Sequence, residues 1–238
     1  MTDRVVLLPG MLCDAGLWAG VESALDVPVV HAELSEPSIT GMAEQVLSCV
    51  DGPMLLVGLS LGAIVGFEVA RLAPERVAGF AALSTNAGAP RPDQHEAWWR
   101  QARRARAGEF CEVVEEILPS MFARQRPVAA GAFREMAARV GTRRFVAQLA
   151  AQATRTDARE VLPMITAPAL VVSGGEDALC PPEFHREIAA GLPDAELYLV
   201  PGAGHLLALE APERTAELVN RLVRRCAPPS TIEEIDCA

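Results

Sequence analysis

A serine between two glycines, in Gly58-Leu59-Ser60-Leu61-Gly62, is the part of this sequence that most directly suggests chemistry. An apolar run, 53–57, precedes it and a helix-compatible run, 63–70, follows it. A serine on such a strand-to-helix turn has its hydroxyl pushed out above the sheet edge, and the crowded backbone favours glycine on both sides. The following helix directs its N–H groups at the serine and favours a negative charge there. The pattern predicts that Ser60 is a nucleophile.

Two later loops carry an acid and a base. Asp177 follows the apolar run 169–172, and His205 follows the run 196–200 in a glycine-rich loop. Because loops after parallel strands meet at one edge of a sheet, both side chains are expected near Ser60. His205 would accept the serine proton, and Asp177 would orient the imidazole and stabilise its charged form.

Each assignment has a plainer alternative. Ser60 could cap the following helix, which is a common role for serine. His205 could be an ordinary loop histidine, and Glu176 could be the acid in place of Asp177. The strand-turn-helix context and the glycine-rich loop favour the catalytic interpretation, and Asp177 is preferred over Glu176.

The remaining candidates have structural interpretations. Asp14 is expected in a turn or helix cap. His95 and His185 are expected at the surface, and His31 at the end of a strand. The segment 84–86 carries no carboxylate, so it does not offer another triad acid.

An oxyanion site would need two backbone N–H groups. The N–H of Leu61, directly after the nucleophile, is the first candidate. The second should come from the loop 9–11, where Met11 is the best candidate. In serine hydrolases, one such donor contributes about 3 kcal/mol.

The elements that must position these residues alternate along the chain. Strands are expected at 5–8, 27–34, 54–57, 77–83, 169–172 and 196–200, and helices at 17–25, 39–50, 61–72, 182–192 and 211–225. This alternation predicts an α/β fold with a parallel sheet covered by helices on both faces.

Strand signals vanish between residues 90 and 159, where helical spacing dominates. This segment is expected as a helical cap inserted into a core of residues 1–89 and 160–226, with a flexible tail at 227–238. Trp98, Trp99 and Phe122 are candidates for an apolar substrate pocket. From residue 91 to 160 there are thirteen arginines against nine acidic residues. A solvated, arginine-rich helical surface is the favoured explanation for this excess of arginine, and binding of an anionic substrate is the alternative.

Composition narrows the possible partners. The net charge of -10 over 238 residues argues against binding nucleic acid or an anionic membrane. No stretch approaches the roughly 20 apolar residues of a membrane span. The first residues run directly into a strand, which predicts no signal peptide and favours the cytoplasm. Six scattered cysteines are expected to be free thiols, with no metal site and no cofactor. The oligomeric state is left open.

Taken together, these motifs resemble α/β-hydrolase fold proteins of the small bacterial esterase and lactonase type. The matching segments are Leu7-Leu8-Pro9-Gly10-Met11, Gly58-Leu59-Ser60-Leu61-Gly62, Gly174-Gly175-Glu176-Asp177 with Pro181-Pro182, and Pro201-Gly202-Ala203-Gly204-His205. The resemblance implies a triad of Ser60, Asp177 and His205 and an oxyanion hole at Met11 and Leu61. It also implies a helical cap over the pocket.

Two departures from the family pattern stand out. Pro9-Gly10 replaces the His-Gly of many relatives, and the chain begins at what would be the family's third strand. About six strands, all parallel, are therefore expected. The predicted function is a cytoplasmic serine hydrolase acting on a small carboxylic ester or lactone with an apolar part. The alternatives are a thioesterase or C–C bond hydrolase, a cofactor-free lyase, and a non-catalytic ligand-binding protein of the receptor-like kind.

Overall fold

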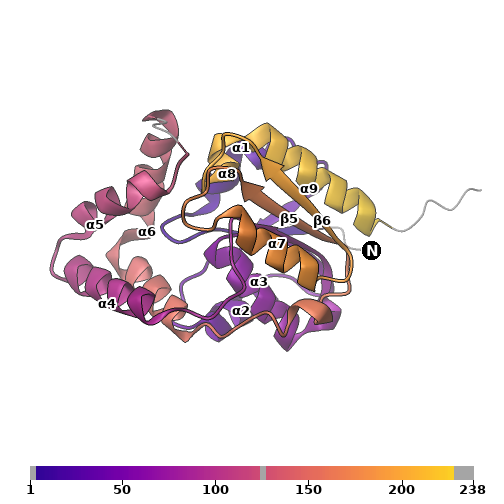
Figure 1. Ribbon diagram of the computed structural model, residues 1–238, viewed down its shortest axis with the longest axis horizontal. Coiled ribbons are helices and arrows are strands. Elements are labelled where there is room, and N and C mark those ends of the chain that lie inside the picture. Colours follow the sequence, from indigo (N-terminus) through magenta and orange to yellow (C-terminus); the bar gives the residue numbers. More distant parts are fainter. Residues whose placement is uncertain (1–3, 124–126, 228–238) are drawn as a thin grey trace, which may run out of the picture.

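One parallel sheet of six strands forms the centre of the molecule (Figure 1). The computed structural model describes residues 4–123 and 127–227. The strands are β1 (Val5–Leu8), β2 (Val29–His31), β3 (Met54–Leu59), β4 (Val77–Leu83), β5 (Ala169–Gly174) and β6 (Ala195–Val200). Their spatial order is β2-β1-β3-β4-β5-β6, and every neighbouring pair is parallel. The prediction of a six-stranded, wholly parallel sheet is confirmed.

Helices cover both faces of this sheet, as predicted. They are η1 (Ala15–Trp18), α1 (Ala19–Glu22), α2 (Ile39–Leu47), α3 (Leu61–Leu72), η2 (Pro74–Arg76), η4 (Leu162–Met164), α7 (Pro182–Gly191), α8 (Leu207–Glu210) and α9 (Pro212–Cys226). Because neighbouring strand residues point to opposite faces, Leu7 packs in the layer that contains α8 and α9, and Leu8 packs in the layer that contains α2 and α3.

Two predicted elements near the N-terminus are shorter or different in kind. The strand expected at 27–34 covers three residues, since it lies at the sheet edge and pairs with β1 through only Val29, Val30 and His31. The helix expected at 17–25 is a 3-10 turn followed by one α-helical turn. Asp14 caps that turn, because its Oδ1 accepts the N–H of Gly16 at 2.9 Å. This is the cap role expected for it.

A group of helices between β4 and β5 stands at one side of the sheet, at the left of Figure 1. We call residues 92–154 the helical segment. It contains α4 (Pro92–Arg106), α5 (Phe110–Ile117), η3 (Leu118–Ser120) and α6 (Pro127–Thr154). Within α6, Gly141 has φ 66° and ψ 171°, which breaks the helix into two parts. Glycine tolerates this left-handed φ without a steric penalty.

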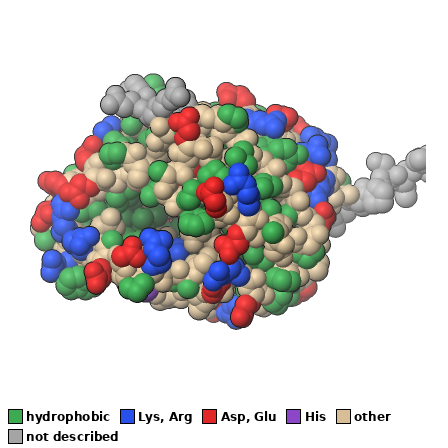
Figure 2. Space-filling model, viewed as in Figure 1, with side chains coloured by type: hydrophobic (Ala, Val, Ile, Leu, Met, Phe, Trp, Pro, Cys, Tyr) green, Lys and Arg blue, Asp and Glu red, His purple; other side chains and the backbone are tan. Residues whose placement is uncertain are grey.

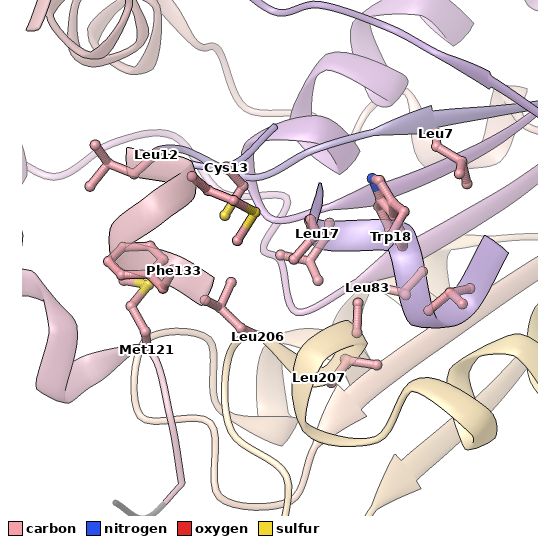
Figure 3. Packing of buried hydrophobic residues seen from close by; sticks show 14 of the residues in the cluster. Leu7, Leu12, Cys13, Leu17, Trp18, Leu83, Met121, Phe133, Leu206 and Leu207 are labelled. Carbon is pink, nitrogen blue, oxygen red and sulfur yellow. The ribbon is translucent and has the colours of Figure 1, made fainter. Parts of the chain in front are cut away.

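The helical segment shares its apolar core with the sheet. Met121 and Phe133 from this segment lie beside Leu12, from the loop after β1, and beside Leu206 near α8 (Figure 3). All four side chains belong to one buried cluster. The segment is therefore packed onto the sheet by the same apolar layer that holds β1 and α8.

On the face shown in Figure 2, acidic and basic side chains are intermingled, and hydrophobic side chains lie between them. Among the described residues, no helix combines the length and the apolarity that a bilayer span requires. Of the tail predicted at 227–238, everything after Ala227 lies outside the described residues.

Candidate active site

The backbone at Ser60 explains why glycines flank it. Ser60 links β3 to α3 with φ 55° and ψ -113°, a conformation that residues other than glycine rarely adopt. A Cβ at position 58 would lie 2.5 Å from the nitrogen of Ala63. At position 62 it would lie 2.1 Å from the carbonyl oxygen of Leu8. Since neither position has room for a side chain, the turn can form only with glycine at both.

The structure brings together the three side chains that the sequence singled out. The Ser60 hydroxyl lies 3.0 Å from Nε2 of His205, and Nδ1 of His205 lies 2.9 Å from Oδ2 of Asp177. His205 and Asp177 are 4% and 3% exposed. Ser60 caps α3 with its backbone position but makes no side-chain bond to the helix. The geometry therefore favours a proton-transfer role for Ser60 and disfavours the alternative in which its side chain caps the helix.

The loop after β5 fixes the Asp177 carboxylate. Its Oδ1 accepts the backbone N–H groups of Leu179 and Cys180, both at 2.9 Å, which leaves Oδ2 for the imidazole. Glu176 is exposed, so Asp177 is the carboxylate that lies against His205. With Nδ1–H donated to Asp177, Nε2 is left free to accept the serine proton.

The loop after β1 carries the other predicted oxyanion donor. Met11 lines the same cavity as Ser60, and Leu61 is the first residue of α3. The next residue, Leu12, has a left-handed φ of 63°, and its N–H donates to Oε1 of Gln148 at 3.0 Å. Gln148, from α6, is 1% exposed. No local sequence pattern predicts this contact, because the partners are 136 positions apart.

The loop that carries His205 is bonded to the helical segment. The N–H of Leu206 donates to the carbonyl oxygen of Met121 at 3.0 Å. The Glu210 carboxylate accepts the N–H of Gly204 at 2.8 Å and that of Ala123 at 3.1 Å. Glu210 therefore connects two backbone segments that lie far apart in the sequence, and the sequence analysis did not identify it.

A cavity of about 240 Å³ opens above Ser60 and His205. Its wall comes from the loops after β1, β3, β4, β5 and β6, from α3, and from the helical segment together with Arg155, which directly follows it. The lining residues are Gly10, Met11, Leu12, Leu59, Ser60, Ile64, Asn86, Gln94, Ala97, Trp98, Gln101, Ile117, Ser120, Met121, Gln152, Arg155, Leu179, Cys180, His205 and Leu206. Ser60 and His205 therefore lie at a small cavity whose lining includes both apolar and amide side chains.

Of the three predicted substrate residues, the structure places one at this cavity. Trp98 is in its wall. Trp99, the neighbouring residue on α4, is 63% exposed, and the guanidinium of Arg103 lies 4.7 Å from its ring centroid. Phe122 packs edge-on against Phe133, with ring centroids 6.4 Å apart, and is not among the lining residues. Adjacent helix positions point in different directions, so the sequence could not separate the two tryptophans.

The expectation that His185 lies at the surface is wrong. Its side chain is fully buried on α7. Nε2 accepts the N–H of Thr85 at 3.0 Å, and Nδ1 lies 3.3 Å from the carbonyl oxygen of Pro181. Burial lowers the pKa of His185 to about 4. The residue joins the loop after β4 to α7. His95 is exposed as expected, and His31 lies at the end of β2 as expected.

One group of side chains could in principle hold a metal. Ligand atoms of Asp177, Cys180 and His205 lie within 4.8 Å of one another. The carboxylate and imidazole are already bonded to each other, however. Burial also raises the pKa of the Cys180 thiol to about 12, and a metal would need the thiolate. The donor set therefore fits a proton relay better than a metal centre. The cysteines among the described residues are free thiols, as expected.

The fold is that of the alpha/beta hydrolases, and comparison with known proteins assigns the chain to the same family. The model of the alpha/beta hydrolase family matches residues 5–218, so the chain belongs to that family. It is a hydrolase, as the resemblance implied.

Individual relatives include esterases and a lactonase. The chain is 27% identical to a pimeloyl-(acyl-carrier protein) methyl ester esterase of Neisseria meningitidis serogroup B, over 84% of this chain and 81% of that one. A thermophilic esterase from Thermogutta terrifontis superposes with a TM-score of 0.83 at 26% identity, over 94% and 90% of the two chains. The enol-lactonase of Burkholderia xenovorans LB400 has the same fold, with a TM-score of 0.85 at 23% identity over 94% and 92%.

Proposed function

We propose that this hydrolase cleaves a small carboxylic ester or lactone through an acyl-enzyme formed on Ser60. One observation carries the proposal. The hydrogen-bonded row from Ser60 through His205 to Asp177 ends at a cavity of about 240 Å³. A serine held by a base, with the base held by a buried carboxylate, is the arrangement that activates a hydroxyl for acyl transfer.

The proposed reaction has two halves. The Ser60 oxygen attacks the ester carbonyl while Nε2 of His205 takes the hydroxyl proton. The tetrahedral intermediate collapses as His205 returns that proton to the departing alkoxide, which leaves as the alcohol. Water then attacks the acyl-enzyme, with His205 again taking a proton and returning it to Ser60, and the carboxylic acid departs. In a lactone, the alcohol and the acid remain parts of one molecule.

The negative charge on the carbonyl oxygen needs fixed donors. We assign this role to the backbone N–H groups of Leu61 and Met11. The first stands at the N-terminus of α3, where the helix dipole adds to the effect. The second is in the loop held by the bond from Leu12 to Gln148. The helical segment acts in this proposal as a cap, since Trp98, Ile117 and Met121 give the cavity its apolar wall.

Labelling with a fluorophosphonate tests the proposal, because the probe reacts with activated serines. Wild type should gain one adduct, on Ser60, and should hydrolyse p-nitrophenyl acetate. Ser60→Ala should fold, take up no label and lose turnover by several orders of magnitude. Ser120→Ala is the matched control, since Ser120 lines the same cavity but its hydroxyl donates to the carbonyl oxygen of Ile117. It should keep the label.

An adduct on another serine, or an active Ser60→Ala enzyme, would overturn the assignment. Acyl-CoA thioesters and lactones run beside the esters distinguish the substrate classes that this triad could serve. A protein that takes up no label and hydrolyses none of these substrates would be a non-catalytic member of the fold.

A further inference from the structure

The cavity above Ser60 contains a buried cation without an acidic partner. Arg155 follows directly after α6, lines the cavity and is 8% exposed. One terminal nitrogen lies 3.3 Å from Oε1 of Gln152, and the other lies 3.2 Å from Oδ1 of Asn86. Its Nε atom is buried and has no hydrogen-bond partner. Among the described residues, no carboxylate forms a salt bridge with it.

Several described arginines of the helical segment, which ends just before Arg155, form ion pairs with acidic residues. Arg104 pairs with Glu116, Arg134 with Glu115 and Arg139 with Asp14. In each of these pairs, both side chains are partly exposed to solvent. These pairs fit the solvated surface that the arginine excess predicted. Arg155 does not, because a guanidinium remains protonated in proteins and its burial without a counter-charge is costly.

The surroundings of Arg155 supply dipoles and no negative charge. The Trp98 ring centroid lies 5.7 Å from the guanidinium carbon. Cys180 is a neutral thiol, since burial raises its pKa to about 12. The nearby Arg91 is already paired with Asp93, so neither of these two residues compensates the charge of Arg155. The site therefore has an uncompensated positive charge that a bound anion would neutralise.

The free N–H groups of Arg155 suit one particular anion. Gln152 and Asn86 each occupy one N–H of a terminal nitrogen, which leaves the Nε–H and the second N–H of each terminal nitrogen. A planar carboxylate accepts two parallel N–H groups from one guanidinium. A single cation also balances a monoanion better than a phosphate dianion. The side chains of Gln94 and Gln101 line the same cavity, and an amide N–H₂ group can donate to a carboxylate.

We propose that Arg155, with Asn86 and Gln152, binds a carboxylate of the substrate. The scissile ester or lactone would then belong to a molecule that also carries a free carboxylate, such as a half-ester of a dicarboxylic acid. This inference rests on the proposed function, because it places the scissile carbonyl at Ser60 and the carboxylate at Arg155 in the same cavity. The apolar wall of Trp98, Ile117 and Met121 would contact the carbons between them.

The test uses pairs of substrates that differ in charge but hardly in shape. Monomethyl succinate, glutarate and adipate are each compared with the methyl ester whose far carboxylate is a carboxamide. For the best chain length, wild type should prefer the carboxylate by roughly 100-fold in kcat/KM, because the carboxamide leaves the buried charge unpaired. Equal kcat/KM values at every chain length would overturn the proposal.

Variants then assign the preference to Arg155. In Arg155→Gln the ratio of the two kcat/KM values should fall to near one, and in Arg155→Lys it should be intermediate, since lysine lacks the planar pair of donors. Arg159→Gln is the matched control, because Arg159 is exposed and paired with Asp157. It should keep the wild-type ratio. A ratio that persists in Arg155→Gln would overturn the proposal.

A binding measurement separates this proposal from the proposed function. Because it uses the wild-type protein, it also does not depend on whether the Arg155 variants fold. Calorimetry on the wild-type protein should show adipate or a shorter dicarboxylate binding, and the matching diamide not binding. This result would stand even if Ser60 took up no fluorophosphonate and no ester were cleaved. Conversely, ester cleavage at Ser60 with no dicarboxylate binding would leave the proposed function intact and overturn the carboxylate site. Tighter binding of a phosphonate analogue would assign the site to a different anion and would also overturn it.

Discussion

The floor and the roof of the cavity are built in different ways. The floor consists of Ser60 and the loops that follow the strands, and close backbone approaches hold it in place. Gly62 lies against the Leu8 carbonyl, and Gly174 lies so near Gly204 that a Cβ would be 2.2 Å from its carbonyl oxygen. The roof is the helical segment, which is held by side-chain packing and by long-range bonds such as that of Gln148 to Leu12.

The glycines show the difference most clearly. In the roof, a Cβ at Gly131 or Gly141 would meet nothing within 4 Å. The close backbone contacts at Gly58, Gly62 and Gly174 in the floor tolerate no additional atom, whereas these two roof glycines have open space around them. The floor is therefore the part whose local sequence is most constrained, and the roof is the part whose sequence can change with the substrate.

The largest expected effect is on the proton relay in the floor. Asp177→Asn should keep the fold, since Asn can still accept the N–H groups of Leu179 and Cys180. It should nevertheless lower kcat/KM by roughly 10⁴-fold, because the amide leaves His205 in the wrong tautomer. Glu176→Gln is the control, with an exposed side chain and a small effect. Steady-state kinetics of both variants check this, and a larger loss in Glu176→Gln would move the acid role to that residue.

A glycine-to-alanine substitution in each region compares how an added side-chain atom changes the stability of the floor and of the roof. Gly62→Ala should lower the free energy of unfolding by about 3 kcal/mol or more, because the new Cβ meets backbone atoms. Gly131→Ala should instead stabilise the protein by about 0.5–1 kcal/mol, because it adds a better helix former in open space on α6. Urea unfolding measures both values. Similar values for the two variants would contradict the contrast between floor and roof.

Acid should weaken the floor through His185. The pKa of His185 is about 4 in the folded protein and about 6.5 as a free side chain. The unfolded chain therefore binds the proton first, and stability falls as pH drops from about 6.5 to about 4, by about 3 kcal/mol in total. His185→Gln, which keeps an acceptor for the Thr85 N–H, should lose less stability over that range. His95→Gln should match wild type, since His95 is exposed. If the stability of His185→Gln fell with pH as steeply as that of wild type, His185 would not be the cause of the acid sensitivity.

The smallest effect is expected in the roof. Trp98→Ala should change the relative kcat/KM of p-nitrophenyl esters of different chain length by roughly tenfold, because Trp98 is in the cavity wall. Trp99→Ala should leave that ranking unchanged and alter stability by less than about 0.5 kcal/mol. Melting temperatures and a chain-length series for both variants test this. Equal changes in preference would mean that the roof acts on the substrate indirectly.

The sequence predicted the floor well because the physical causes there are local. The glycines at 58 and 62, the strands that end beside Ser60 and Asp177, and the order of the loops are all visible within a few residues of each feature. Helix α3 and strand β4 begin and end at the predicted residues.

What the sequence did not reveal depends on contacts between distant segments. His185 looked like a surface residue, because nothing near it indicates that Thr85 packs over it. Gln148, Glu210 and Arg155 each have a hydrogen-bond partner dozens of positions away, so their roles emerge only in three dimensions. The excess of arginine was visible as a total, but the total could not show that Arg155 is buried while described arginines such as Arg134 and Arg139 are exposed.

The bonds from Met121 and Ala123 to the loop of His205 bear on how such a protein can be altered. The roof supplies the carbonyl that receives the Leu206 N–H and the N–H that Glu210 accepts. The helical segment and the loop of His205 are thus held together by backbone hydrogen bonds rather than being independent modules. An engineer who transplants the helical segment from a relative would have to transplant positions 204–210 with it, or the grafted enzyme would bind its new substrate beside a misplaced histidine.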